Sequence, residues 1–228
     1  MEQMTKRILG IIPARGGSKG LSRKNILPLN GKPLISWTIE SSLKSKYITT
    51  TIVSSEDTEI LNISKEFGAE ILVRSEELAQ DSSSSEVVVS DVLSQLKKHR
   101  FDYLILLQPT SPLRTSEDID NAFDLFFKSD ADALISMKKI DNKILKAFTK
   151  NEDGYLNGIS NNTYPFLRRQ DLPETYLSNG AIYIIEVKKF LENKSFFTNK
   201  TISYLMDDIK SIDIDTKEDL EKVEEYIK

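Results

Sequence analysis

Residues 8–25 read ILGIIPARGGSKGLSRKN, and this stretch sets the expectation for the fold. Its first seven letters show almost no polar alternation, which is typical of a strand buried on both faces of a parallel sheet. A basic, glycine-rich loop follows. The chain then reads PLISWTIESSL, in which Ile35, Ile39 and Leu43 recur every four residues and predict an amphipathic helix beginning at Pro33. Strand, loop and helix in this order predict the first unit of an α/β fold.

The same alternation continues along the chain. Short apolar runs alternate with amphipathic helical patterns, and the joining segments are short and polar. The patterns predict strands at 50–55, 69–73, 103–108 and 131–137 and helices at 57–68, 84–99 and 116–128. We therefore expect a doubly wound α/β protein with a mostly parallel sheet and right-handed crossovers.

The alternation breaks at about Lys138. Residues 139–178 are rich in Asn, Lys, Asp and Tyr and contain several glycine and proline breakers, and they are too long for a simple loop. A length of 228 residues is about one and a half average domains, which leaves room for an inserted subdomain. We expect a core of residues 1–138 and 179–228, completed by a strand at 180–185, a helix at 187–194, a strand at 211–215 and a helix at 216–228.

The composition excludes several kinds of chemistry. The chain has no cysteine and one histidine, His99, which excludes a disulfide framework, a thiolate nucleophile, a zinc finger and any site with two histidines. We assign His99 no catalytic role. The formal charge of −4 and the pI near 5.3 disfavour nucleic-acid binding. No apolar segment is long enough to span a bilayer, so we expect a cytoplasmic protein that does not contact the membrane.

The loop after the first strand concentrates positive charge. It holds four basic residues among three glycines, namely Arg15, Lys19, Arg23 and Lys24 with Gly16, Gly17 and Gly20. Glycines bring backbone N–H groups close to an anion, and guanidinium and ammonium groups bind phosphate. The spacing fits neither G-x-x-x-x-G-K-[ST] nor G-x-G-x-x-G. The loop is a candidate phosphate site, and the alternative is a flexible, solvated basic loop.

An acidic pair, Asp213 and Asp215, precedes the last predicted helix. Residues i and i+2 of a strand point to the same face, so Ile212 and Ile214 are expected in the core and the two carboxylates side by side. Such a pair suits Mg²⁺, which keeps water ligands and bridges to substrate phosphates. Alternatively, Asp215 caps the following helix and Asp213 faces solvent.

Two further stretches lie at strand ends. LLQPTSPLR offers Gln108, Thr110, Ser111 and Arg114 as hydrogen-bonding groups, although a structural turn before a helix cap at Thr115 is the favoured interpretation from chemistry alone. The Asn-Gly of NGAIYI fits a turn into a strand, and the Phe-Phe pair of NKSFFTN fits a place in the core.

Taken in order, IIPARGGSKGLSRKN, LLQPTSPLR, RRQDLP, NGAIYI and SIDIDT resemble the acylneuraminate cytidylyltransferase family, and the resemblance covers essentially the whole chain. Its members are the CMP-sialic acid synthetases and bacterial relatives for legionaminic, pseudaminic and, more distantly, Kdo sugars. The resemblance implies a core like that of nucleotide-diphospho-sugar transferases. It also implies an enzyme of cell-surface polysaccharide biosynthesis that couples CTP to a nine-carbon 2-keto sugar acid and releases pyrophosphate. Residues 139–178 would be the dimerisation arm of a homodimer, inserted between neighbouring active sites.

The resemblance also implies roles for individual residues. The residues expected at the nucleotide are Arg15, Gly16, Gly17, Ser18, Lys19 and Lys24 near the phosphates and Asn25 and Arg74 near the cytidine. Those expected at the sugar acid are Gln108, Tyr183, Phe196 and Phe197, with Arg169 reaching in from the arm. Asp213 and Asp215 would hold Mg²⁺ or Mn²⁺, and the residues expected to act in catalysis are Arg15, Lys19, Lys24 and Asp213.

Two departures from the family pattern concern the stiffness of the basic loop and the identity of the sugar, respectively. Ser22 stands where the family usually has proline, and Ile185-Glu186-Val187 replaces the Asn-Asp pattern of several sialic acid enzymes. NGAIYI itself is more similar to the sialic and legionaminic acid enzymes than to the pseudaminic ones. Enzymes for pseudaminic acid or Kdo, a metal-dependent glycosyltransferase and a non-catalytic nucleotide-binding module are the alternatives. The sequence names no general base: a metal-bound water and a carboxylate are the candidates.

Overall fold

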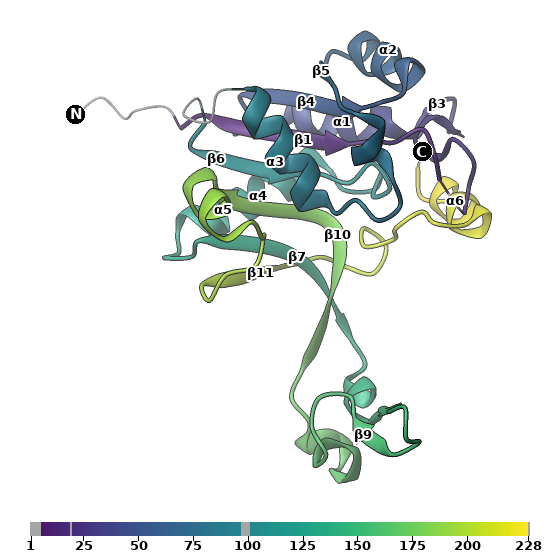
Figure 1. Ribbon diagram of the computed structural model, residues 1–228, viewed down its shortest axis with the longest axis vertical. Helices are drawn as coiled ribbons and strands as arrows, with labels where there is room; N and C mark the ends of the chain where they lie inside the picture. Colours follow the sequence, from purple (N-terminus) through teal and green to yellow (C-terminus); the bar gives the residue numbers. More distant parts are fainter. Residues whose placement is uncertain (1–5, 19, 97–100, 228) are drawn as a thin grey trace.

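The computed structural model describes residues 6–18, 20–96 and 101–227. Its centre is a seven-stranded sheet with the order β11-β7-β10-β6-β1-β4-β5 (Figure 1). These strands are β1 (Ile8–Pro13), β4 (Thr50–Ser55), β5 (Glu70–Val73), β6 (Tyr103–Leu106), β7 (Ala133–Ile140), β10 (Thr175–Glu186) and β11 (Thr201–Leu205). Only β10 runs antiparallel to its neighbours, so the mostly parallel α/β sheet expected from the sequence is confirmed.

Helices cover both faces of this sheet. They are α1 (Leu34–Lys44), α2 (Thr58–Glu66), α3 (Ser85–Gln95), α4 (Ser116–Phe127) and α5 (Val187–Asn193), whereas α6 (Lys217–Glu224) packs against Leu29 and Leu34. One buried cluster joins Ile8 and Ile12 to α1, α2 and α4, and a second joins Leu9 and Ile11 to α3 and α5. The alternate residues of β1 thus enter opposite cores, which explains its unbroken apolar run.

The last part of the chain differs from the prediction. Residues 212–215 form no regular strand: they are extended beside the loop after β6, where the Ile214 N–H donates to the Thr110 carbonyl at 2.9 Å. The sheet edge is instead β11, paired in parallel with β7. The predicted helix at 216–228 is the shorter α6, capped by Thr216 in a capping box with Asp219. His99, at the end of the third predicted helix, lies outside the described residues.

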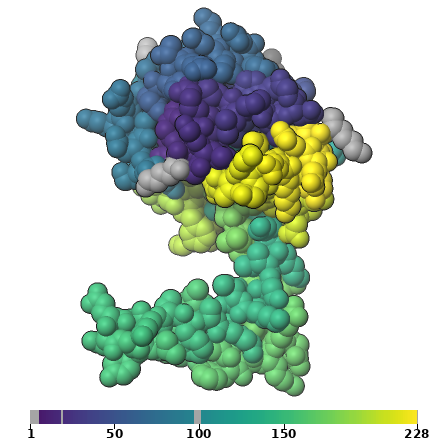
Figure 2. Space-filling view, turned by 90° about the vertical axis from the view of Figure 1, so that its right-hand side faces the viewer, coloured from purple at the N-terminus to yellow at the C-terminus, as the bar shows by residue number. Residues whose placement is uncertain are grey.

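Residues between β7 and β10 form an arm that stands clear of the core (Figures 1 and 2). The two strands continue beyond the sheet as a paired stalk that ends at Ile140 and Thr175. Beyond it lie the 3₁₀ turns η4 (Asn142–Lys146), η5 (Tyr164–Phe166) and η6 (Arg169–Asp171) and a hairpin of β8 (Phe148–Lys150) and β9 (Leu156–Gly158). None of residues 141–174, all of them described, belongs to the three buried hydrophobic clusters.

The remaining short elements surround the basic loop. They are the 3₁₀ turns η1 (Lys24–Ile26) and η2 (Glu76–Ala79) and the hairpin of β2 (Pro28–Leu29) and β3 (Lys32–Pro33). The third buried cluster joins Leu29 and Leu34 to Ile214 and Val223, so it packs the C-terminal segment against the region that follows the basic loop. In the described part of the chain, no helix combines the length and the hydropathy needed to cross a membrane.

Candidate active site

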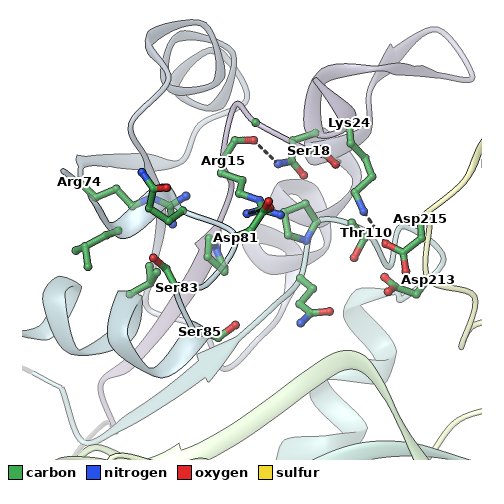
Figure 3. A pocket seen from close by; sticks show the side chains of 18 residues that line it. Arg15, Ser18, Lys24, Arg74, Asp81, Ser83, Ser85, Thr110, Asp213 and Asp215 are labelled. Carbon is green, nitrogen blue, oxygen red and sulfur yellow. Dashed lines mark hydrogen bonds and ion pairs between the residues drawn. The ribbon is translucent and has the colours of Figure 1, made fainter. Parts of the chain in front are cut away.

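A cleft with a volume of about 350 Å³ lies at the ends of strands β1, β5 and β6 (Figure 3). The segments after β1, β5 and β6 line it, together with the extended segment before α6. This is the edge at which open α/β sheets bind their ligands. Of the residues expected at the site, those that line the cleft are Arg15, Gly17, Ser18, Lys24, Asn25, Arg74, Gln108, Asp213 and Asp215. Lys19 lies outside the described residues.

The described part of the basic loop is held by specific contacts. Asn25 is 6% exposed, and its side chain donates to the Arg15 carbonyl at 2.9 Å. This hydrogen bond connects the two ends of the loop. A Cβ at Gly20 would lie 2.5 Å from the Asp215 carbonyl oxygen, so glycine lets the loop approach the acidic segment. These contacts disfavour the alternative of a flexible, solvated loop.

Two of the loop's groups serve the fold. The Gly16 N–H donates to a carboxylate oxygen of Glu56 at 2.7 Å and is therefore not directed at a ligand. The Arg23 guanidinium donates to Asp57 at 3.0 Å and to Glu59 at 2.7 Å, at the start of α2. Its charge is thus paired, and Arg23 does not line the cleft.

Asp57 secures this end of the loop. Its carboxylate caps α2 by accepting the N–H groups of Glu59 and Ile60 at 2.9 and 3.0 Å. Burial raises the pKa of Asp57, but the hydrogen bonds from Arg23, Ile60 and Glu59 outweigh it and hold the pKa below its usual value. A Cβ at Gly16 would lie 2.4 Å from Asp57 Oδ2. The ionised side chain therefore fixes α2 and the loop together.

Replacing Asp57 with alanine should lower the free energy of unfolding by about 1 kcal/mol, because the helix loses its cap. Asp57→Asn should retain most of that stability, since asparagine caps equally well. The pKa of Asp57 is lowered in the folded state. The difference in free energy of unfolding between wild type and Asp57→Ala should therefore have its full size above about pH 4. It should become smaller as the pH falls below that value. Urea titrations between pH 3 and 7 measure it, and a difference that grew on acidification would contradict the assignment.

The acidic pair lies across the cleft from Arg15, with Lys24 between it and the loop (Figure 3). Burial is the main cause that raises the pKa of Asp213, the charge of Asp215 adds to it, and a hydrogen bond from Thr110 acts in the opposite direction. Asp213 Oδ1 is buried without a hydrogen-bond partner among the described residues. Asp215 is 71% exposed, and its Oδ1 accepts from Lys24 Nζ at 2.8 Å. Asp213 is only partly exposed and the cap of α6 is Thr216, so the structure does not support the alternative of a capping Asp215 beside a solvent-facing Asp213.

These carboxylates fit a hard cation. No point in the described parts of the chain is surrounded by three or more Asp, Glu or His side chains, so a metal ion here would have two carboxylate ligands at most. Mg²⁺ is commonly held by one or two carboxylates together with water and substrate phosphates. The unpartnered oxygen of Asp213, together with the carboxylate of Asp215, supplies that donor set.

The loop after β6 is both structural and part of the site. Thr115 caps α4 in a capping box, as the structural interpretation expected, while Gln108 and Thr110 line the cleft. Arg114, 1% exposed, donates to the carbonyls of Ala181 at 2.9 Å and Gln108 at 3.3 Å. Burial lowers its pKa to about 9. Arg114 thus binds the loop to β10 and offers no donor to the cleft.

Gly180 leaves the space that Gln108 occupies. Its φ is +77°, and a Cβ there would lie 2.3 Å from Gln108 Oε1. The register of β10 against β7 shifts between Ser178 and Tyr183, around this glycine. Asn179, 6% exposed, donates to Ser211 Oγ at 2.9 Å and accepts from Ser136 Oγ at 2.6 Å. The Asn-Gly pair is therefore a bulge within β10 and not a turn before it.

Gly180→Ala should destabilise the protein by about 1–2 kcal/mol, because the backbone conformation disfavours a side chain. It should also displace Gln108 and raise several-fold the KM of a substrate that contacts Gln108. Gly31→Ala is the matched control: its φ is +80°, and no atom lies within 4 Å of the added Cβ. Denaturant titration and steady-state kinetics compare the two variants. Equal KM values would show that the space above Gly180 does not affect the site.

The structure places the other expected sugar-acid residues away from the cleft lining. Phe196, 4% exposed, packs its ring 5.5 Å from that of Tyr183 and 5.2 Å from that of Phe190, in the second buried cluster. The Tyr183 hydroxyl forms a hydrogen bond with Ser178 Oγ at 2.9 Å. Phe197 is 66% exposed, and Arg169 pairs with Asp141 on the arm at 3.3 Å.

The cleft also contains residues that the sequence interpretation did not select. Asp81, Ser83 and Ser85 come from the segment between η2 and α3. Arg15 Nη1 lies 2.6 Å from Asp81 Oδ1. The available signal was the position of the Asp-Ser run after a predicted strand, at the same sheet edge as the basic loop.

Residues 9–226 match the family model described as Cytidylyltransferase. The chain belongs to the cytidylyltransferase family. It is 37% identical over 211 residues to the N-acylneuraminate cytidylyltransferase of Streptococcus agalactiae serotype V, with 92% of this chain and 50% of that protein covered. It therefore spans about half the length of that relative. It is also 37% identical over 220 residues to the CMP-N,N'-diacetyllegionaminic acid synthase of Legionella pneumophila, with 92% of this chain and 91% of that protein covered.

A solved structure shares the fold. A CMP:2-keto-3-deoxy-manno-octonic acid synthetase complexed with CTP superposes with a TM-score of 0.73 at 18% identity, covering 97% of this chain and 98% of that one. The family and the fold expected from the sequence motifs are thereby confirmed.

Proposed function

We propose that this cytidylyltransferase family member transfers CMP from CTP to a nine-carbon 2-keto sugar acid of the N-acylneuraminate type, sialic or legionaminic acid, and releases pyrophosphate. The observation that carries the proposal is the single cleft shared by the basic loop, Gln108 and the acidic pair. The similarity to an N-acylneuraminate cytidylyltransferase and to a CMP-N,N'-diacetyllegionaminic acid synthase supports the nucleotide and the class of acid.

The reaction needs positioning and charge neutralisation. The anomeric hydroxyl of the sugar acid loses its proton to a carboxylate or a water and attacks the α-phosphorus. A new P–O bond forms, and the bond to pyrophosphate, the leaving group, breaks. Arg15, Ser18 and Lys24 line the cleft where the triphosphate would lie, and Lys19 belongs to the same loop. The cationic groups of Arg15, Lys19 and Lys24 would offset the charge that grows on the α-phosphate and on the departing pyrophosphate. No cysteine or second histidine is required.

The acidic pair would hold the metal ion, Mg²⁺ or Mn²⁺. The ion would supply Lewis-acid neutralisation of phosphate charge when bound. Asp213 offers the buried oxygen that lacks a partner among the described residues, and Asp215 keeps the Lys24 ammonium beside it. Lys24 is thereby held at the phosphate end of the cleft before the nucleotide binds.

The sugar acid would lie beyond Gln108, on the side of β10. Gln108 is fixed there by the close approach of Gly180, and Tyr183 follows on the same strand. Phe196 would act through its packing against Tyr183, because it is itself buried. Phe197 and Arg169 are exposed and remain proposed contacts of the sugar acid.

The arm would pair two copies of the chain in a homodimer. It projects from the core and exposes large apolar side chains, with Tyr155 71%, Leu156 63% and Phe166 81% exposed. Exposed apolar clusters of this kind mark interaction surfaces. Sedimentation velocity should give a dimer for the wild type and a monomer for a Leu156→Glu/Phe166→Glu variant. A monomeric wild type at micromolar concentration would contradict this proposal.

A substrate panel tests the proposed function. CTP and Mg²⁺ are offered with sialic, legionaminic and pseudaminic acids and Kdo, one at a time, and pyrophosphate release is measured. We expect the highest kcat/KM with sialic or legionaminic acid. Preference for pseudaminic acid or Kdo would overturn the substrate assignment, and no pyrophosphate with any acid would overturn the activity. A parallel reaction that offers a CMP-sugar as donor identifies a glycosyltransferase.

A further inference from the structure

Glu56 is the first residue after β4, and its carboxylate contacts two separate parts of the cleft wall. Oε1 accepts the Gly16 N–H at 2.7 Å, which ties Glu56 to the basic loop. Oε2 accepts from Arg74 Nη2 at 3.1 Å and Nε at 3.3 Å, which ties it to the residue that follows β5. One side chain therefore connects the ends of three strands, β1, β4 and β5.

The contact with Arg74 is shielded from water. The Arg74 side chain is 3% exposed and that of Glu56 is 15% exposed. Hydrogen bonds between charged groups are among the stronger ones, and a buried cation without its partner is costly. Arg74 also donates its backbone N–H to the Ser55 carbonyl at 3.1 Å. Its position is thus fixed at both the backbone and the guanidinium.

Arg74 lines the cleft and Glu56 does not. A guanidinium has five N–H donors, and the bonds to Glu56 use the Nε–H and one N–H of Nη2, on one side of the group. The Nη1 donors, which have no acceptor among the described residues, remain for a ligand. Glu56 therefore decides which edge of Arg74 can meet a nucleotide.

We propose that Glu56 is a positioning residue for the nucleotide. It orients the Arg74 guanidinium at the cleft and holds the basic loop, through Gly16, next to Arg74. This inference rests on the proposed CTP site. Glutamate is required at this position for two reasons. Both oxygens must accept, which glutamine cannot do, and the carboxylate must span from the loop to the guanidinium, which the shorter aspartate cannot do.

The test separates nucleotide binding from acceptor binding. For Glu56→Gln we expect the Kd of CTP by calorimetry, and its KM in the pyrophosphate assay, to rise at least tenfold. The KM for the sugar acid should change less than twofold. Glu40→Gln is the matched control, since Glu40 is a partly buried carboxylate paired with Lys32 at 2.6 Å and lies outside this cleft. An unchanged CTP Kd, or equal rises in both KM values, would overturn the proposal.

A double variant shows whether Glu56 acts through Arg74. In an Arg74→Gln background, adding Glu56→Gln should change the CTP Kd less than threefold, because the group that Glu56 orients is already absent. A tenfold change there would overturn the proposal. If Glu56→Gln alone does not fold, comparing Arg74→Gln with the double variant still tests the proposal, because the double variant contains no unpaired buried arginine. If the wild type binds CTP but makes no CMP-sugar, the proposed function fails while the Kd comparison still tests Glu56.

Discussion

Asp213→Asn should lower kcat by about a hundredfold or more in saturating Mg²⁺, while the protein remains folded. Asp213 carries a buried carboxylate oxygen without a partner in the described chain, and its pKa is raised chiefly by that burial. Such a group is costly to the fold, and a bound cation would offset the cost. Asparagine removes the charge and leaves the shape nearly unchanged. Steady-state pyrophosphate release as a function of Mg²⁺ concentration measures the effect.

Thermal unfolding without metal provides an independent readout of Asp213. Because the variant no longer buries an unpaired carboxylate, its Tm in EDTA should equal or exceed that of the wild type. Asp208→Asn, which changes an exposed carboxylate a few residues earlier, should alter neither kcat nor Tm. A kcat for Asp213→Asn within threefold of wild type would contradict the metal assignment.

Lys24→Ala should have the second large effect, a loss of about a hundredfold in kcat. The Lys24 side chain is 14% exposed, and its ammonium lies 2.8 Å from Asp215 Oδ1 in the cleft. Removing it takes away a cation that would offset charge on the α-phosphate. It also leaves the acidic pair without its nearest positive charge.

Circular dichroism and single-turnover kinetics distinguish this role from a structural one. The variant should fold as the wild type does and form product slowly even with saturating CTP. Lys217→Ala removes a solvent-exposed lysine of α6 and should have no effect. If Lys24→Ala changed only the KM for the sugar acid, the phosphate role assigned to Lys24 would be wrong.

The sequence predicted the elements that are buried and periodic. β1 was recognisable because helices cover both faces of the sheet around it. The α1 stripe was recognisable because Ile35 and Ile39 pack into the core, but its third residue, Leu43, is 47% exposed. β11 was missed because it is a half-exposed edge strand with no long apolar run. Residues 212–215 alternate like a strand, yet Ile214 is buried by the cluster around Leu29 and not by a sheet.

The site was predictable to the extent that strand ends bring motifs together. The basic loop, Gln108 and the acidic pair do line one cleft. Contacts between distant residues were not predictable. The positive charge of Arg23 indicated phosphate binding, but Asp57 and Glu59 pair with it. Glu56 stood out in no motif, because its importance lies in bonds to two segments that the fold brings together.

In the proposed function, this cleft transfers the α-phosphate of CTP, as CMP, to a sugar acid. The most direct measurement follows the label from CTP carrying ³²P at either the α or the γ position, with the preferred acid and Mg²⁺. We predict that the α label appears in a CMP-sugar and the γ label in pyrophosphate, in equal amounts, and that Asp213→Asn slows both. Transfer of the γ label to the acid, or release of labelled orthophosphate without a CMP-sugar, would contradict the proposed function.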